Sequence, residues 1–303
     1  MSIRKFNDTQ KHSITPIKQE NNTIFAKGYH FHDSEKITFN SIDLFYTRKN
    51  ITDDIALGAD AGVFYLQKDD IVRYNGIRYG ASLFWNHFTL RLGMNNFDDF
   101  SEFVPTLRYE NSYKNHSYSL EYTHQNSLFY TYSLCSYENR ISADHFSLSD
   151  YITLKNQKNL WINLEVNHFS NTDTETTGQF DWRFYYSKLY QKRFNYDLAL
   201  EGWYTSHSKQ HNCFYSPKFA DSTMIRIDPQ YVFSKYIGIR GKAGLGYSFM
   251  DKSLAYKLGL WFFGNPKDKL SYSAGCLYSN SMRVSASSSY NYEECEVNLG
   301  YSW

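Results

Sequence analysis

The sequence predicts an all-β protein, a single closed antiparallel transmembrane β-barrel of about 16 strands (14–18). Apolar and polar residues alternate with period two through most of the chain, and no segment holds a helical stripe. Tyr, Phe and Trp make up 19% of the residues, and they favour pleated, half-buried surfaces. At roughly 19 residues for each strand and its connection, the 303-residue chain has room for about 16 strands.

The alternating segments each have one apolar face and one polar face. In "NLWINLEVNHF" (159–169), for example, Leu160 and Ile162 lie on one face, and Asn163 and Glu165 lie on the other. Similar segments follow in order: "GQFDWRFYYSKLY" (178–190), "RFNYDLALEGWYTS" (193–206), "TMIRIDPQYVF" (223–233), "YIGIRGKAGLGYSF" (236–249) and "EVNLGYSW" (296–303). The last of these ends the chain on an aromatic residue, Trp303, as expected for a closing strand whose apolar face meets lipid.

Polar breaks separate these segments and come in two lengths. Short, turn-like breaks at 111–117, 154–159, 189–195 and 263–269 predict hairpins, whereas 169–178 and 205–212 are longer. Short turns at one end and long loops at the other suit a membrane barrel. A soluble β-sandwich also alternates, but its core is mainly Val, Ile and Leu, whereas here Tyr and Phe repeatedly end the apolar faces.

Composition excludes several classes of protein. The net charge is +1 with no basic block, so nucleic acid is not an expected partner. No stretch of about 18 consecutive apolar residues predicts a transmembrane helix. The four cysteines, Cys135, Cys213, Cys276 and Cys295, are far apart without a CxxC pair, so we expect neither a metal site nor a disulfide framework. Cys276 and Cys295 read as small lipid-facing hydrophobes.

The chain divides into a polar N-terminal extension, residues 1–20, and a barrel, residues 21–303. The extension has early positive charge but lacks the apolar core of a secretory signal. No 34-residue helical repeat is present either. We therefore expect either a piece of a longer protein or a stand-alone relative of one.

From about residue 74 onward the chain resembles the C-terminal barrel domain of the cellulose synthase operon protein C family. The resemblance lies in three ordered segments, 116–140, 159–190 and 198–219, the last of which contains the aromatic-Ser-Pro stretch Phe214–Pro217. It implies a Gram-negative outer-membrane porin of 16 strands that exports an extracellular polysaccharide, cellulose or a related glucan, in exopolysaccharide and biofilm formation. The implied partners are the glucan, outer-membrane lipid and lipopolysaccharide, and, indirectly, an inner-membrane synthase complex. The family's periplasmic helical repeats are absent from this chain.

If the apolar faces meet lipid, the opposite faces line the lumen and form the expected substrate path. The apolar face of a pyranose can stack on an indole, and its hydroxyls can bond to carboxylates and guanidinium groups. The alternative is that these side chains only fill the barrel and neutralise one another. The candidate path-lining residues are Trp161, Glu165, Asp181, Arg183, Asp197, Glu201, Trp203, Arg226, Arg240 and Trp261.

Transport by such a pore would be passive, and no nucleotide-binding motif, cofactor or metal is expected. The rival enzymatic interpretation is an outer-membrane lipid A deacylase, with His168 and Ser170 on one strand face and Glu165 or Glu175 as the carboxylate. His30 and His32 also share a face, but no third metal ligand is in register. A structural or adhesive barrel is a further alternative. We expect no enzyme.

Overall fold

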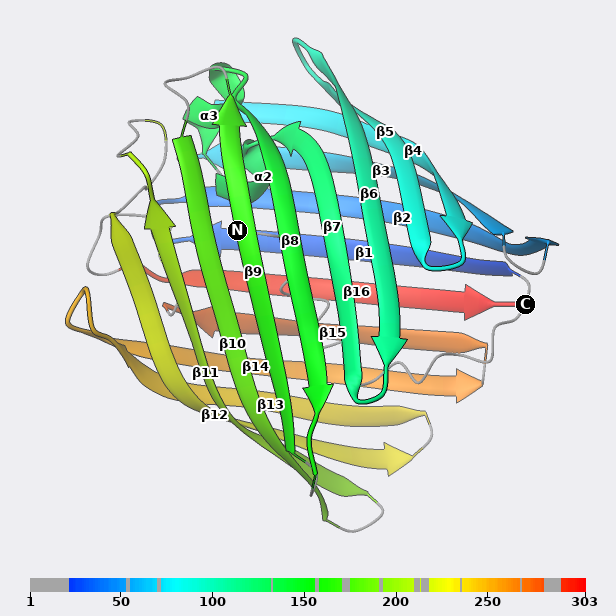
Figure 1. Cartoon of the computed structure of the whole chain (residues 1–303), viewed down its shortest axis with the longest axis vertical. Coiled ribbons are helices and arrows are strands. Elements are labelled where there is room, and N and C mark those ends of the chain that lie inside the picture. The colour runs from blue at the N-terminus through cyan, green and yellow to red at the C-terminus, as the bar shows by residue number, and fades with distance from the viewer. Residues whose placement is uncertain are drawn as a thin grey trace.

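The fold was analysed in a computed structural model of the chain. It describes residues 22–52, 55–69, 72–131, 133–155, 158–170, 175–190, 193–209, 213, 218–234, 236–267, 269–280 and 290–303. Within them, sixteen antiparallel strands form one closed ring in which each strand pairs with its sequence neighbours and β1 pairs with β16 (Figure 1). The predicted fold class and strand number are confirmed.

The strands are long enough to cross a bilayer at a tilt, since about 9–11 residues suffice. Their bounds are β1 Asn22–Asp33, β2 Ile37–Thr52, β3 Ile55–Lys68, β4 Val72–Trp85, β5 Phe88–Phe97, β6 Ser101–Tyr113, β7 His116–Asn126, β8 Ser142–Thr153, β9 Lys158–Ser170, β10 Glu175–Tyr190, β11 Phe194–His207, β12 Phe219–Ser234, β13 Ile237–Ser248, β14 Ser253–Lys267, β15 Leu270–Ser279 and β16 Tyr292–Ser302. Two short helices, α2 Leu128–Thr131 and α3 Leu134–Glu138, interrupt the series between β7 and β8.

The two ends of the barrel differ in their connections. At one end, here called the turn end, every connection has two to four residues, and β1 starts and β16 finishes there. The other end, the loop end, carries the three longest connections, 127–141, 208–218 and 280–291. The short breaks expected from the sequence all fall at the turn end, and the expected long break at 205–212 falls in the 208–218 connection. The expected long break at 169–178 is wrong, because the strands β9 and β10 leave only the four residues 171–174 between them.

The side chains alternate between an apolar outer face and a polar inner face. Leu, Ile, Val, Phe and Tyr side chains of one parity are exposed on the outside of the ring, whereas charged and amide side chains of the other parity are buried inside it. On β16 the exposed residues are Val297, Leu299 and Tyr301, followed by Trp303 directly after the strand, and the buried ones are Glu294, Glu296, Asn298 and Ser302. The register requires this pattern, because a one-residue slip would turn every charge toward lipid.

Aromatic side chains collect on the outer face near the turn end. Trp303 stacks on Tyr46 and on Tyr301, with ring centroids 6.3 and 5.7 Å apart. Further round the ring, Phe88 packs on Tyr109 at 4.9 Å. Amphipathic rings at one level around a barrel form the girdle expected at a membrane interface.

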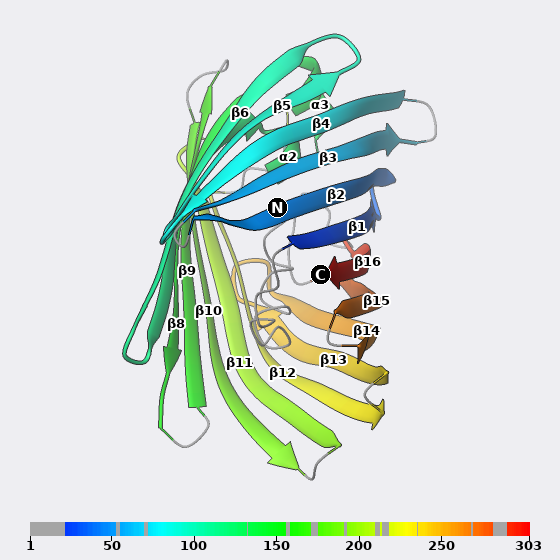
Figure 2. The ribbon, with the colours of Figure 1, turned by 90° about the vertical axis from the view of Figure 1, so that its right-hand side faces the viewer.

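Among the described helices, none has the length and apolar character needed to span a membrane. The helices α2 and α3 instead lie within the ring of strands near the loop end (Figures 1 and 2). They were not anticipated from the sequence, in which no segment holds a helical stripe. Their apolar side chains pack against inward-facing aromatic residues of the wall and form the largest buried apolar cluster among the described residues.

The expectation that the cysteines are unpaired is wrong. Cys276 and Cys295 are directly opposite each other on β15 and β16 and form a disulfide on the outer face. Cys135 and Cys213 form a second disulfide, which joins α3 to the β11–β12 connection. Sequence spacing gave no hint of either pair, because both are created by strand register and loop position in the closed barrel.

Candidate functional site: the lumen and its mouth

All ten candidate path-lining residues lie on strands β9 to β14 and belong to the inward-facing set. Cross-strand pairing fixes this, since Arg183 is opposite both Trp161 and Glu201, and Arg240 is opposite Trp261. The three remaining tryptophans, Trp85, Trp182 and Trp303, have the outward parity. One side of the lumen therefore carries indoles among charged groups.

A buried ion cluster forms the centre of this wall. The carboxylate of Glu201 contacts Arg183 Nε at 2.5 Å, Lys257 Nζ at 2.9 Å and the guanidinium of Arg226. Arg226 Nε also lies 2.8 Å from Asp228 Oδ1. The shared carboxylate keeps the three cations in fixed positions, because moving any of them away would leave a buried charge without a partner, which is strongly unfavourable.

Beside this cluster, an indole and an amide extend the polar surface. The guanidinium of Arg183 lies over the ring of Trp161, 5.3 Å from its centroid. Asn163 Nδ2 donates to Glu165 Oε1 at 2.7 Å and approaches Asp181 Oδ2 at 3.4 Å. Six of the ten candidates, Trp161, Glu165, Asp181, Arg183, Glu201 and Arg226, are thus brought into two adjoining networks.

The other four candidates, Asp197, Trp203, Arg240 and Trp261, lie around these networks on β11, β13 and β14. Trp203 is opposite Asp181 in register, and Asp197 is opposite Asp228. Arg240 donates to Gln230 Oε1 at 2.8 Å.

The indole of Trp261 lies flat on the wall. A Cβ on Gly275 would meet it at 2.4 Å, so the side chain needs the space that glycine leaves.

Several inward-facing charged residues were missed by sequence reasoning. Lys242 of β13 and Lys257 of β14 face the lumen, and Lys242 Nζ lies 5.2 Å from the centre of the Trp261 ring. On the opposite wall, Arg91 Nη2 pairs with Asp60 Oδ2 at 2.6 Å, and a second arginine–aspartate pair, Arg78–Asp43, lies next to it. The alternation of odd and even positions along each strand would have identified these charged residues, since each lies on the strand face already assigned to the lumen.

The wall offers mixed charge, hydrogen-bond donors and acceptors, and flat aromatic rings. Hydroxyl-rich chains can exchange hydrogen bonds with such a surface, and their apolar ring faces can contact indoles. Because most of the carboxylates and guanidinium groups are paired with one another, the surface is suited to many weak contacts rather than to one tight site.

The mouth of the lumen at the loop end is occupied by the segment between β7 and β8. Phe129 of α2 packs against three aromatic rings of the wall, with centroids 5.3 Å from Phe64 and 6.2 Å from Phe39 and Phe97. Phe129 and its neighbour Leu128 are almost fully buried. We call residues 127–131 and 133–141 the strap.

The helix α3 attaches the strap to the rim formed by β4 and the β5–β6 turn. Tyr137 packs on Tyr74 with centroids 4.1 Å apart, and its hydroxyl donates to Asp99 Oδ1 at 2.8 Å. Burial, together with the Asp99 carboxylate, raises the pKa of Tyr137 above its usual range, so the hydroxyl stays a donor. Tyr74 in turn donates to Glu138 Oε1 at 2.9 Å.

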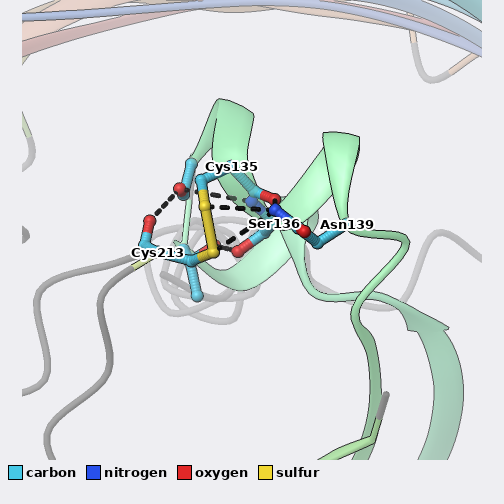
Figure 3. The surroundings of a disulfide bond; sticks show 6 residues. Cys135, Ser136, Asn139 and Cys213 are labelled. Atoms are coloured by element: carbon cyan, nitrogen blue, oxygen red, sulfur yellow. Dashed lines mark hydrogen bonds between the residues drawn. A yellow bond between two sulfur atoms is a disulfide. The ribbon is translucent and has the colours of Figure 1, made fainter. Parts of the chain in front are cut away.

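The other side of the strap is tied covalently. Figure 3 shows the disulfide between Cys135 of α3 and Cys213 of the β11–β12 connection. Around it, Ser133 donates a hydrogen bond to the carbonyl of Cys213, and Asn139 Nδ2 donates to the carbonyl of Cys135 at 2.9 Å. Cys213 also contacts an apolar cluster that includes Tyr130 and Phe169.

The strand register separates Glu165 from the other two residues of the rival enzymatic interpretation. His168 and Ser170 share the outward parity of β9, whereas Glu165 points into the lumen. Ser170 Oγ is 3.0 Å from Ser142 Oγ on the next strand. The side chain of Glu175 lies outside the described residues, so its place in this interpretation is not tested.

Two other sequence features have defined positions. His30 and His32 lie on the outer face, opposite Cys295 and Glu293 of β16. Glu293 Oε1 is 3.3 Å from Cys295 Sγ, but that sulfur is already bonded to Cys276. The stretch Phe214–Pro217 lies outside the described residues.

No protein-family model and no curated protein matches the sequence. Among solved structures, the chain is similar to one described as "Bacterial polysaccharide outer membrane secretin", with a TM-score of 0.76 and 10% identity over 94% of this chain and 99% of that one. It is also similar to CdiB from Acinetobacter baumannii, with a TM-score of 0.56 and 9% identity over 93% of this chain and 60% of that one.

These likenesses show the fold, a 16-strand barrel of the Gram-negative outer membrane. Barrels of this kind place short turns in the periplasm and long loops outside the cell. From that rule we infer that the turn end is periplasmic and that the strap lies at the extracellular mouth.

Proposed function

We propose that this barrel is an exit pore through which an extracellular polysaccharide, cellulose or a related glucan, reaches the cell surface. The observation that carries the proposal is the likeness, over nearly the full length of both chains, to a barrel described as a polysaccharide secretin. The lumen supports it, since indoles and paired charges line one wall.

The ten candidate residues serve as the path in this proposal. Trp161, Trp203 and Trp261 provide flat apolar surfaces for pyranose rings, and the carboxylates and guanidinium groups between them exchange hydrogen bonds with hydroxyls. The polymer is pushed from the inner membrane by its synthase, so the pore needs no energy source of its own. Weak binding at several positions lets the chain advance without being trapped.

The proposal is tested by replacing both Trp203 and Trp261 with Ala in cells that secrete the glucan. We expect the amount of secreted polymer to fall several-fold while the barrel level in the outer membrane is unchanged. Trp182→Ala is the matched control, because Trp182 is on the same wall but has the outward parity. Unchanged secretion by the double variant would remove the assigned role of these indoles.

A further inference from the structure

Lys242 of β13 differs from the cations beside it on the lumen wall. Arg226 and Lys257 both contact the carboxylate of Glu201. Asp228 Oδ1 lies 2.8 Å from Arg226 Nε and acts on Lys242 only at longer range. Within the part of the chain that the structure describes, Lys242 Nζ has neither a hydrogen bond nor an ion pair. Its three N–H donors are therefore available to an anion from outside the wall.

The ammonium of Lys242 instead lies over the ring of Trp261, 5.2 Å from its centroid. On the wall side the ring rests against the backbone of β14 and β15, since a Cβ added at Gly259 or at Gly275 would meet ring atoms at 2.4 Å. Trp261 is only 6% exposed, which fits a ring that is covered from both sides. Lys242 thus occupies the side from which a sugar would approach the indole.

This arrangement discriminates between neutral and charged sugars. A neutral pyranose that stacks on Trp261 has to displace the ammonium, and it offers no charge in return for the lost cation–π contact. A sugar with a carboxylate or a phosphate ester pairs with the displaced ammonium while its ring takes the face of the indole. Charge on the sugar therefore favours binding at this position.

We propose that Lys242 and Trp261 form a subsite for an anionic sugar residue, so that the glucan carried by this pore bears oxyanion groups. In the structure the ammonium rests on the indole. When the polymer enters, its anionic group draws Lys242 Nζ aside and a pyranose ring takes its place on Trp261. The inference rests on the proposed function, since it names the chemistry of the polymer that the pore would carry.

The subsite is tested by isothermal titration calorimetry on the full chain in detergent. The probes are cellohexaose and two derivatives of it, one carboxylated and one phosphorylated at the primary hydroxyls. We expect the better derivative to bind at least about tenfold more tightly than cellohexaose at low salt. The preference should shrink at high salt, because ions screen the pair. The tighter derivative identifies the oxyanion, and equal affinities for all three oligomers would overturn the proposal.

Variants of Lys242 locate the effect. Lys242→Gln should bind the three oligomers with affinities within about twofold of one another, because the counter-charge is gone. It should bind cellohexaose no more weakly than the parent does, since the indole is no longer covered. Lys242→Arg should keep the preference for the charged oligomer. Heat-modifiable mobility on gels verifies that each barrel is folded.

Arg91→Gln is the matched control. It removes the same charge from the opposite wall, where Arg91 pairs with Asp60. This variant should keep the preference of the parent for the charged oligomer. If it loses the preference as Lys242→Gln does, the oligomers respond to the net charge of the lumen, and the subsite is overturned.

Failure of the subsite is distinguishable from failure of the proposed function. Equal binding of neutral and charged oligomers would remove the anionic subsite and leave an exit pore for a neutral glucan in place. Binding of none of the oligomers would contradict both proposals.

Discussion

Arg226 of β12 and Glu201 of β11 form an ion pair inside the lumen, and Arg183 and Lys257 contact the same carboxylate at 2.5 and 2.9 Å. Removing that carboxylate leaves three cations facing one another. We expect Glu201→Gln to lower the free energy of unfolding by about 3 kcal/mol, as for other broken buried ion pairs. Urea titration followed by tryptophan fluorescence measures this change.

The matched control for Glu201 is Asp60→Asn on the opposite wall. Asp60 has a one-to-one pair with Arg91, so its loss exposes a single cation. Asp60→Asn should therefore lower the free energy of unfolding by clearly less than Glu201→Gln does. If both variants lose the same free energy of unfolding, the four-membered cluster around Glu201 stabilises the barrel no more than a single ion pair does.

Gly275 of β15 lies directly between Trp261 and Glu296 in the register of three strands. An added Cβ would meet the carbonyl oxygen of Leu260 at 2.3 Å and the Trp261 ring at 2.4 Å. Gly275→Ala should therefore destabilise the barrel by about 1–3 kcal/mol, the usual range for overpacking. At Gly28 the nearest atom is 3.9 Å away, so Gly28→Ala should be close to neutral. The stability of the Gly275→Ala and Gly28→Ala barrels is compared by their heat-modifiable mobility on gels.

Trp303 stacks on Tyr46 and Tyr301 at the periplasmic girdle. Replacing it with Ala removes an interfacial ring and its aromatic contacts, so we expect a loss of roughly 1–2 kcal/mol and slower insertion into vesicles. Trp303→Phe keeps a ring at the site and should retain most of the stability. Identical insertion rates for both variants and the parent would contradict a girdle role for Trp303.

Ser170 lies on the outer face of β9, hydrogen-bonded to Ser142 and turned away from Glu165. In a transport barrel its hydroxyl has no chemical task. We therefore expect Ser170→Ala to leave the acyl-chain pattern of lipid A unchanged, as measured by mass spectrometry of purified lipid A. A gain of acyl chains in the variant strain would favour the deacylase interpretation over the pore.

The alternation of apolar and polar residues in the sequence determined which face of its strand each side chain occupies. In "EVNLGYSW", Val297, Leu299, Tyr301 and Trp303 had to share one face because the side-chain period of a strand is two, and the structure exposes all four on the outside. The same rule assigned Trp161, Glu201 and Arg226 to the lumen. Chain length and turn spacing then fixed the strand number, since each strand must cross the same bilayer.

Tertiary structure alone decided which residues meet across the ring. Glu201 and Lys257 are 56 positions apart and touch only because β11 to β14 curve around one lumen. Cys135 and Cys213 meet because the strap folds inward instead of continuing as strand, and no local pattern marks that turn. Contacts that depend on closure of the barrel leave no periodic signal in the chain, so the pore wall could be predicted and the two short helices inside the loop end could not.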